Sequence, residues 1–448
     1  MSWSASSFPM RPLGELATIQ AGYAFESARF TDVPTDLPLV KGENVQQGYV
    51  DWSIAKRWPE AEIDALEQFL LRPGDIVVAM DRPWVEAGLK WAYIKPEDPP
   101  SLLVQRVARL RAGAEIDQTY LRAIISSSYF SAYIQPIVTG VNVPHISGKQ
   151  IAAFKVPVPS MDVQRKIAAL ICAYDDLIAN NQRRIALLES MAEEIYREWF
   201  VRMRFPGAGH KPLSNGIPSG WVSRPLRKLI THYIGGGWGE DQATTICPDG
   251  AFVFRGTDLP AIQDGDWDNF VYRFHKPSAL AFRTLAVGDF VFEVSGGSTN
   301  QLLGRNLMVS TQLLEHLDAP AICASFCKLI RFDQAAIAPL WMKYFLKLYY
   351  DSGLVGLYQV QSTGISNYQF EAFITRQTVL VPDASLQAEF CKLVEPLNEQ
   401  RDSLARANLH LKRTRYALLP RLISGKLRVD ALDIKFPPSM QQPEETAP

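Results

Sequence analysis

The sequence is poor in cysteine and has no long apolar run. Only five cysteines occur among 448 residues, and no two of them have the CxxC spacing of metal or redox sites. An odd number of scattered cysteines predicts reduced thiols in a cytoplasmic protein rather than a disulfide framework. No stretch approaches the ~18 consecutive apolar residues of a membrane span, and residues 1–11 lack the pattern of a secretion signal. These absences predict a soluble, cytoplasmic protein.

Net charge is also nearly absent. Lys and Arg total 46 against 47 for Asp and Glu. A chain with this balance is not attracted as a whole to nucleic acid or to an anionic membrane. Any DNA binding must therefore use local basic patches or partner proteins. Residues 401–428 form a basic stretch, with eight Lys or Arg residues against the single acidic Asp402.

The motifs of several catalytic chemistries are missing. There is no Asn-Pro-Pro-aromatic motif, which an adenine methyltransferase needs to hold an extruded base, and no GxxxxGK[ST] phosphate loop. The glycine cluster Tyr233–Trp238 lacks GxGxxG spacing, so it predicts a turn. Asp383 and Glu389 fit the start of a helix better than a nuclease site, and the six histidines are isolated from other metal ligands. The sequence therefore predicts no catalytic residue, no metal site and no cofactor in this chain.

Two long helices are predicted from apolar residues that recur in steps of four and three. The first runs from Val163 to Val201 without internal Pro or Gly, and Asn181 is the polar residue of its stripe. This 3.5-residue period is that of a coiled-coil seam, so each helix needs a partner. Pro396 predicts a break or kink in the second helix. The stripe of the second helix comprises Leu386, Phe390, Leu393, Leu397, Gln400, Leu404, Ala407, Leu411, Thr414 and Leu418.

Landmarks of the first half recur in the second half at a nearly constant offset, which indicates an internal duplication. The corresponding pairs are Arg11-Pro-Leu and Arg224-Pro-Leu, Gly74-Asp75 and Gly288-Asp289, Thr139-Gly140 and Thr363-Gly364, Val158-Pro159 and Val381-Pro382, and Gln164 and Gln387. Two similar units, each followed by a long helix, can pack with approximate two-fold symmetry if the helices are antiparallel. The predicted fold class is α/β (α+β), with two tandem domains of mixed sheet and helices separated by two long antiparallel coiled-coil helices with pseudo-two-fold symmetry.

The predicted boundaries follow from this order. A linker is expected where Pro, Gly and Ser are dense between the halves, and a disordered tail after the second helix. The segments are a first domain at 1–160, a first spacer helix at 161–203, a linker at 204–222, a second domain at 223–383, a second spacer helix at 384–428 and a disordered tail at 429–448.

The chain resembles the specificity (S) subunits of type I restriction-modification enzymes, the HsdS family, over nearly its whole length. The resemblance rests on the order and duplication of the landmarks above and on the segment Leu419–Arg428, LPRLISGKLR. It implies two target-recognition domains that each read one half of a split double-stranded DNA target, while the helices set the gap. It also implies two modification subunits that methylate adenine, and motor-nuclease restriction subunits. S-adenosylmethionine, ATP and Mg would then belong to the partner subunits, and this chain would be non-catalytic.

Polar loops at equivalent positions of the two copies are the candidates for reading base edges. For any one of these residues, a polar turn without a partner is the alternative. For the basic stretch, a face that contacts DNA phosphates, a dock for an acidic partner and a solvated helix face all remain open, and docking with some phosphate contact is the favoured interpretation. The DNA-binding candidates are Arg82, Trp84, Asn142, His145, Lys149, Ser298, Thr299, Asn300, Gln301, Arg305, Asn367 and Tyr368, and the partner-docking candidates are Arg413, Arg415, Arg421 and Lys426.

Two other functions stay open beside the one that the resemblance implies. The chain could be a standalone two-domain DNA-binding scaffold or regulator that works without methyltransferase partners. It could also be an enzyme in its own right, which the missing motifs disfavour. An attached methyltransferase would separate the first alternative from a specificity subunit, and methylation by the purified chain alone would support the second.

Overall fold

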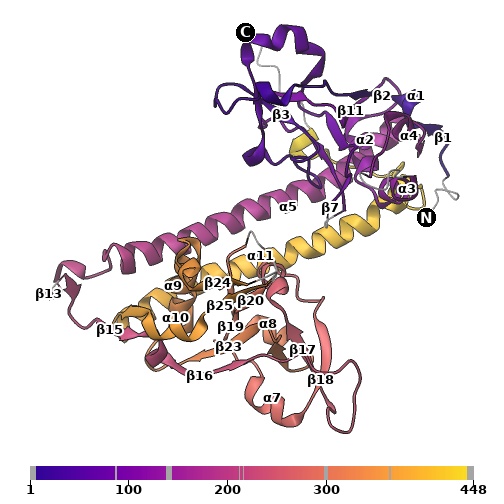
Figure 1. Cartoon of the computed structure of the whole chain (residues 1–448). Helices are drawn as coiled ribbons and strands as arrows, with labels where there is room; N and C mark the ends of the chain where they lie inside the picture. Colours follow the sequence, from indigo (N-terminus) through magenta and orange to yellow (C-terminus); the bar gives the residue numbers. More distant parts are fainter. Residues whose placement is uncertain are drawn as a thin grey trace. The chain divides into compact units, whose positions relative to one another are not determined.

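The chain folds into two units, of which the first takes residues from two separate stretches of the sequence and the second is one continuous stretch (Figure 1). The computed structural model describes residues 7–85, 88–137, 144–210, 212–214, 216–296, 301–362 and 365–440. The first unit comprises Met1–Ile178 and Leu411–Pro448, and the second comprises Ala179–His410. Each unit therefore contains part of both long helices.

The first unit is built on two four-stranded sheets. One is antiparallel, with the order β2 (Ala17–Ala21), β11 (Val107–Ala112), β6 (Ile76–Ala79) and β9 (Trp91–Tyr93). The other is mixed, with the order β4 (Arg57–Trp58), β3 (Leu37–Val40), β10 (Ser101–Leu103) and β5 (Leu70–Leu71). Apolar runs such as β6 are buried along their whole length, as expected for central strands. The unit also contains α2 (Gln118–Ile125), α3 (Ser128–Ile137), α4 (Gly148–Ala152) and the strand pair β1 (Met10–Pro12) with β12 (Lys155–Pro157).

The second unit repeats this plan. Its antiparallel sheet has the order β16 (Ile230–Gly235), β23 (Cys327–Phe332), β19 (Phe290–Glu293) and β21 (Asn306–Met308). Its mixed sheet has the order β18 (Val271–His275), β17 (Asp249–Phe254) and β22 (Ala321–Cys323). The equivalents of β1, β12, α2 with α3, and α4 are β15 (Val222–Pro225), β26 (Thr378–Val381), α9 (Pro339–Asp351) and α10 (Phe370–Arg376). This agreement confirms the predicted fold class and the duplication.

The Gly-Asp turn that opens the central strand is built in the same way in both units. Both glycines adopt left-handed backbone conformations, with φ of 90° and 85°, which suits a residue without Cβ. The aspartates that follow are buried. Asp75 accepts a hydrogen bond from Arg111 Nη2 at 2.8 Å, and Asp289 accepts two from Arg331 at 2.7 Å. In each unit the turn is therefore fixed by a charge pair from the neighbouring strand.

A buried glutamine fastens the start of each long helix to its unit. Gln164 Oε1 accepts from Asp117 N at 2.9 Å, and its Nε2 donates to Pro159 O at 3.0 Å. Gln387 makes the equivalent bonds, accepting from Ala338 N at 2.8 Å and donating to a proline carbonyl at 2.9 Å. A side-chain amide satisfies both a backbone donor and a backbone acceptor here, so neither is left unpaired in the interior.

The first long helix, α5 (Met161–Tyr196), continues as a π-helical turn over Arg197–Val201, close to its predicted extent. Its predicted stripe is buried or half-buried throughout. The second long helix is α11 (Ala384–Ile423), and the two helices run side by side in opposite directions within each unit. In the second unit Asn181 Nδ2 donates to Asn408 Oδ1 at 3.0 Å.

The inward face of α11 differs from the predicted stripe. Leu393 is 51% exposed, whereas Val394 is fully buried. The inward face then continues through Arg401, Asn408 and Arg415, each one residue beyond the predicted position. Their partners on α5 are Glu189, Asn181 and Asp175, at 2.9, 3.0 and 2.7 Å. A hydrophobic pattern could not reveal this face, because three of its layers are polar and each is matched by a polar side chain on α5.

Pro396 does not break α11, which is uninterrupted from Ala384 to Ile423. The missing proline N–H removes the donor for the carbonyl of Lys392. Both residues are exposed, so water can replace the lost hydrogen bond. The helix also ends earlier than predicted, because Gly425 adopts φ of 74° and Leu427 N bonds back to Arg421 O, the arrangement of a glycine-terminated helix.

The predicted disordered tail and surface linker are both more ordered than expected. Val429 is buried in the core of the first unit, Lys166 Nζ donates to Asp430 O at 2.9 Å, and a helical turn forms at Pro438–Met440. Residues 441–448 lie outside the described residues. In the linker, the rings of Phe205 and Trp221 are buried and stacked 5.5 Å apart. Burial of apolar side chains therefore outweighs the flexible composition of both segments.

Candidate nucleic-acid interface

In the first unit, the segment after the central strand β6 pairs with the segment before α4. In the second unit, the segment after the central strand β19 pairs with the segment before α10. Asp81 forms an antiparallel bridge with His145, and His145 Nδ1 lies 2.8 Å from Asp81 Oδ1. In the second unit β20 (Ser295–Gly296) pairs with β25 (Ile365–Tyr368), and Ser295 Oγ donates to Asn367 Oδ1 at 2.6 Å. His145 and Asn367 therefore occupy equivalent positions. The structure brings together the loops that the sequence nominated in both copies.

Two arginines beside Asp81 have unusual backbone conformations. Arg82 and Arg106 adopt φ of 44° and 74°, a region that costs energy for any residue with a Cβ. The backbone fixes both, because Arg82 N donates to Pro144 O at 2.7 Å and Arg106 O accepts from Met80 N at 2.8 Å. Arg106 Nε lies 3.5 Å from Asp81 Oδ2. The first unit thus presents Arg106 and His145 around the carboxylate of Asp81, with Arg82 next to it in the chain.

The residue equivalent to Arg106 in the second unit is Phe326. Its carbonyl accepts from Val294 N at 2.9 Å and from Ser295 N at 3.2 Å, as the carbonyl of Arg106 accepts from the residue that follows β6. Phe326 is 56% exposed. Neither residue was nominated from the sequence, because each is a single side chain in a short turn before a strand and belongs to no motif.

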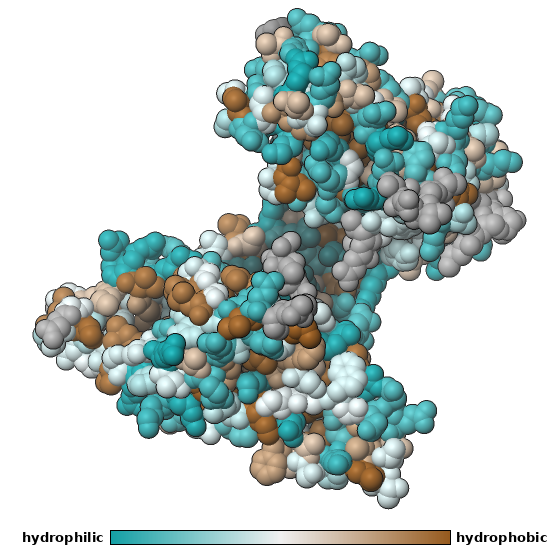
Figure 2. Space-filling model, viewed as in Figure 1, coloured by the Kyte–Doolittle hydropathy of each residue, from teal (hydrophilic) through white to brown (hydrophobic). Residues whose placement is uncertain are grey.

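The hairpin of β24 (Gln359–Ser362) and β25 adds apolar and polar side chains to the same surface. Val360 and Ile365 are 46% and 45% exposed, and Val360 is paired directly with Asn367. Alternation along β25 places Ile365 and Asn367 on the outer face, and the residues between and after them on the inner face. Figure 2 shows hydrophobic side chains interspersed with hydrophilic ones on the face of the second unit that is in view.

Two of the nominated residues, Tyr368 and Arg305, have side chains that are buried or paired within the second unit. Tyr368 is only 6% exposed and packs in the core of the second unit, because it follows the outward Asn367 in the strand. Burial raises the pKa of Tyr368 far above its ordinary value. Arg305 donates to both carboxylate oxygens of Glu293, at 2.7 and 2.8 Å, and both side chains are largely buried. Neither side chain is therefore exposed and unpaired in this structure, in contrast to what the sequence predicted for a residue that reads bases.

The other nominated loop residues lie at or near the surface. Trp84, in the hairpin of β7 (Trp84–Val85) and β8 (Gly88–Leu89), is half-buried against the first unit's core. Lys149 is exposed on α4, whose first turn is closed by a capping box from Ser147 and Gln150. Gln301 is exposed. Asn142, Ser298, Thr299 and Asn300 lie outside the described residues.

The nominated docking residues divide into two groups. Arg415 faces inward, with its Nε 2.7 Å from Asp175 Oδ1, so its charge is matched inside the first unit. Arg413, Arg421 and Lys426 are exposed. The exposed members keep the outer side of this part of α11 and of the segment after it basic.

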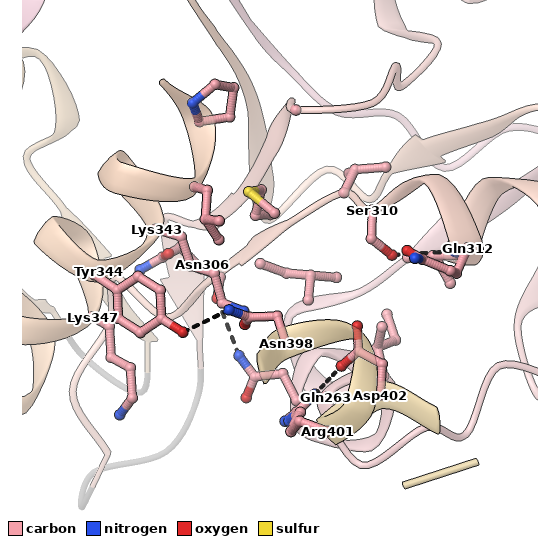
Figure 3. Close-up of a pocket in the computed structure, with 18 of the residues that line it drawn as sticks. Gln263, Asn306, Ser310, Gln312, Lys343, Tyr344, Lys347, Asn398, Arg401 and Asp402 are labelled. Carbon is pink, nitrogen blue, oxygen red and sulfur yellow. Dashed lines mark hydrogen bonds and ion pairs between the residues drawn. The ribbon is translucent and has the colours of Figure 1, made fainter. Parts of the chain in front are cut away.

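A cavity of about 810 Å³ in the second unit lies between α9, α11 and β21 (Figure 3). Two of its cationic side chains, Arg401 and Lys347, are paired with carboxylates within the unit. Arg401 donates to Glu189 at 2.9 Å and to Asp402 at 2.8 Å. Lys347 lies 3.0 Å from a carboxylate oxygen of Glu193. These pairs join α9 and α11 to the end of α5.

Lys343 in this cavity has an amide rather than a carboxylate as its hydrogen-bond partner. It donates to Asn398 Oδ1, and Asn398 Nδ2 in turn donates to Tyr344 Oη at 2.8 Å (Figure 3). Burial lowers the pKa of Lys343 to about 8. The cavity therefore holds a polar network that links α9 to α11. This network does not include the loops that carry Asn367 and Phe326.

Within the described residues, no helix combines the length and apolar character needed to cross a membrane. The same residues hold no cluster of three His, Cys, Asp or Glu side chains placed to bind a metal ion.

Comparison with known families finds one domain model. The type I restriction modification DNA specificity domain matches residues 6–190. The MjaVIII type I specificity subunit of Methanocaldococcus jannaschii is 28% identical over 184 residues, which cover 41% of this chain and 43% of that protein. The EcoAI specificity subunit of Escherichia coli is 35% identical over 167 residues, covering 37% and 27%. The chain thus spans less than half the length of these two relatives.

Two further similarities extend over more of the chain. The MjaIX specificity subunit of M. jannaschii is 24% identical over 328 residues, covering 70% of each protein. The crystal structure of a type I restriction-modification S subunit from M. genitalium superposes with a TM-score of 0.55 at 13% identity, covering 93% of this chain and 96% of that one. This structural likeness shows that the two chains share a fold.

Proposed function

We propose that this chain is a specificity subunit of the type I restriction-modification family and recognises a DNA target made of two separated half-sites. One half-site is read by each unit. The observation that carries this proposal is the pair of equivalent surfaces, Asp81 with His145 and Ser295 with Asn367. Each surface carries side chains of the kinds that read base edges in the major groove.

The chain acts without catalysis of its own in this proposal, and it works in the cytoplasm. Two modification subunits supply adenine methylation with S-adenosylmethionine, and motor-nuclease restriction subunits supply cleavage with ATP and Mg. The exposed Arg413, Arg421 and Lys426 are candidates for contact with these partners. The whole chain has no excess of positive charge with which to hold DNA. Contacts with DNA and with partner subunits must therefore come from local basic patches such as this one.

Mapping of N6-methyladenine in the host genome tests the proposal. A strain that lacks the gene is compared with the same strain carrying the wild-type gene or an empty vector. We expect the wild-type gene alone to restore methylation at a motif with two specified parts and unspecified bases between them. Unchanged methylation without the gene would contradict the proposal, and so would a single continuous motif.

A further inference from the structure

The two surfaces differ in chemistry at the equivalent positions Arg106 and Phe326. Each residue lies in the turn before the strand that pairs with the central strand, and each backbone carbonyl accepts from the residue that follows the central strand, Met80 or Val294. Both side chains are open to solvent, at 54% and 56% exposure. The same place in the fold therefore presents a guanidinium in one unit and an aromatic ring in the other.

Arg106 is held in a way that favours recognition by its side chain. Its φ of 74° would suit glycine better, so an arginine at this position carries a backbone cost that a glycine would avoid. The carboxylate oxygen Oδ2 of Asp81 lies 3.5 Å from Nε of Arg106. Within the described part of the chain no other ion pair occupies the two terminal nitrogens. This leaves a fork of two donors, the arrangement that matches O6 and N7 of guanine.

The second surface is suited to A·T pairs. Phe326 and the outer face of the β24–β25 hairpin expose apolar groups, including Val360 and Ile365, which can contact the methyl group of thymine. Asn367 lies on the same face, and its Oδ1 is fixed by the hydroxyl of Ser295. The Nδ2 group and the remaining lone pair of Oδ1 form the donor and acceptor set that pairs with N6 and N7 of adenine. Ser295 also fastens the turn of Phe326 beside this face, because its backbone N–H donates to the backbone carbonyl of Phe326.

We infer that the first unit specifies a G·C pair through Arg106, whereas the second unit specifies A·T pairs through Phe326 and Asn367. This inference rests on the proposed function and adds which class of base pair each surface selects. The two half-sites then differ in composition, although the units that read them share one plan.

The test uses the complex purified from its native cells, with the wild-type chain or a variant in it, to select duplexes from a randomised pool. Arg106→Gln is expected to lose about 5- to 150-fold of the preference for guanine at one position, in one half-site only. Phe326→Ala is expected to relax a thymine position in the other half-site only. Phe326→Arg gives the second surface the guanidinium group of the first, and it is expected to introduce a guanine preference in the half-site that the second unit reads.

Arg72→Gln is the matched control, because Arg72 is exposed in the Gly-Asp turn, beyond the end of β6 opposite to Asp81. It should leave every position unchanged. The inference is overturned if Arg106→Gln weakens binding uniformly across sequences, as loss of a phosphate contact would, or if both variants alter the same half-site. Failure of the wild-type complex to select any two-part motif would instead overturn the proposed function.

Discussion

Lys343 allows a direct test of how the second unit tolerates a buried charge. Its amine lies in the cavity between α9 and α11 and donates to Asn398 Oδ1. Burial lowers the pKa of Lys343 from 10.5 to about 8. The unfolded chain therefore binds this proton more tightly than the folded chain does. The lysine charge then opposes folding at neutral pH, and wild-type stability gains a rising contribution as the pH increases from the folded to the unfolded pKa.

The size of the effect follows from the two pKa values. The difference between 10.5 and about 8 corresponds to about 3 kcal/mol against folding at pH 7. Lys343→Met removes this cost but leaves Asn398 Oδ1 without its donor, which costs about 1–2 kcal/mol. We expect the variant to be about 1–2 kcal/mol more stable than the wild type at pH 7. At about pH 9.5 roughly 2 kcal/mol of the lysine cost has disappeared, so the advantage of the variant should vanish.

Calorimetric melting of the full chain at the two pH values measures this difference. At pH 7 the transition of the second unit should rise by about 2–8 °C in Lys343→Met. Lys392→Met is the control, because Lys392 is exposed on α11 and its substitution should not move the transition. A Lys343→Met variant that melts below the wild type at pH 7 would refute the reasoning. A difference between variant and wild type that does not change with pH would do the same.

Four further variants test the framework of the units. Arg331→Met leaves the buried Asp289 without its bidentate partner, and urea unfolding should show a loss of about 3–5 kcal/mol. Replacing Asn181 and Asn408 together by Leu should raise the melting temperature, since it exchanges a polar layer for an apolar one, whereas Asn408→Ala alone should lower it. Gly236→Ala would push a methyl group into the backbone carbonyls before β23, and the melt should reveal a loss of about 1–3 kcal/mol or more.

Each of these substitutions has a counterpart or a control in the chain. Arg111→Met should destabilise the first unit in the manner of Arg331→Met, because Asp75 is buried as well. Gly235→Ala meets no atom within 4 Å and should be tolerated, so equal losses at positions 235 and 236 would argue against the close-contact explanation. If the double Leu variant melts below the wild type, the layer of Asn181 and Asn408 stabilises the helices more than an apolar layer does. That result would contradict the expectation.

The sequence was a good guide wherever periodicity or repetition carried the information. The helix α5 and its stripe could be predicted because apolar residues recur in steps of four and three, with Asn181 as the polar exception. The stripe of α11 was misplaced by one residue, since Arg401 and Asn408 face inward and a hydrophobic pattern cannot show charges that are matched on another helix. Pro396 was expected to interrupt the helix, but exposure makes its missing hydrogen bond inexpensive.

The candidate interface was only partly visible in the sequence. His145 and Asn367 could be nominated because repetition put polar loops at equivalent positions. The sequence could not show that Tyr368 faces inward and Asn367 outward, because the register of β25 decides the face on which each side chain lies. Arg106 and Phe326 were missed because their meaning depends on a fold-level equivalence between two turns that share no residue type.

The core of the first unit includes Leu419, Leu422, Ile423 and Val429, which a ribosome adds only after the entire second unit. The ~250 residues in between take on the order of 10–50 s to synthesise at ordinary rates of translation. Until then the amino-terminal unit lacks part of its interior, so the half of the protein that is made first is completed last. A premature stop codon shortly before Leu419 would therefore damage the fold at the beginning of the chain more than the fold beside the truncation.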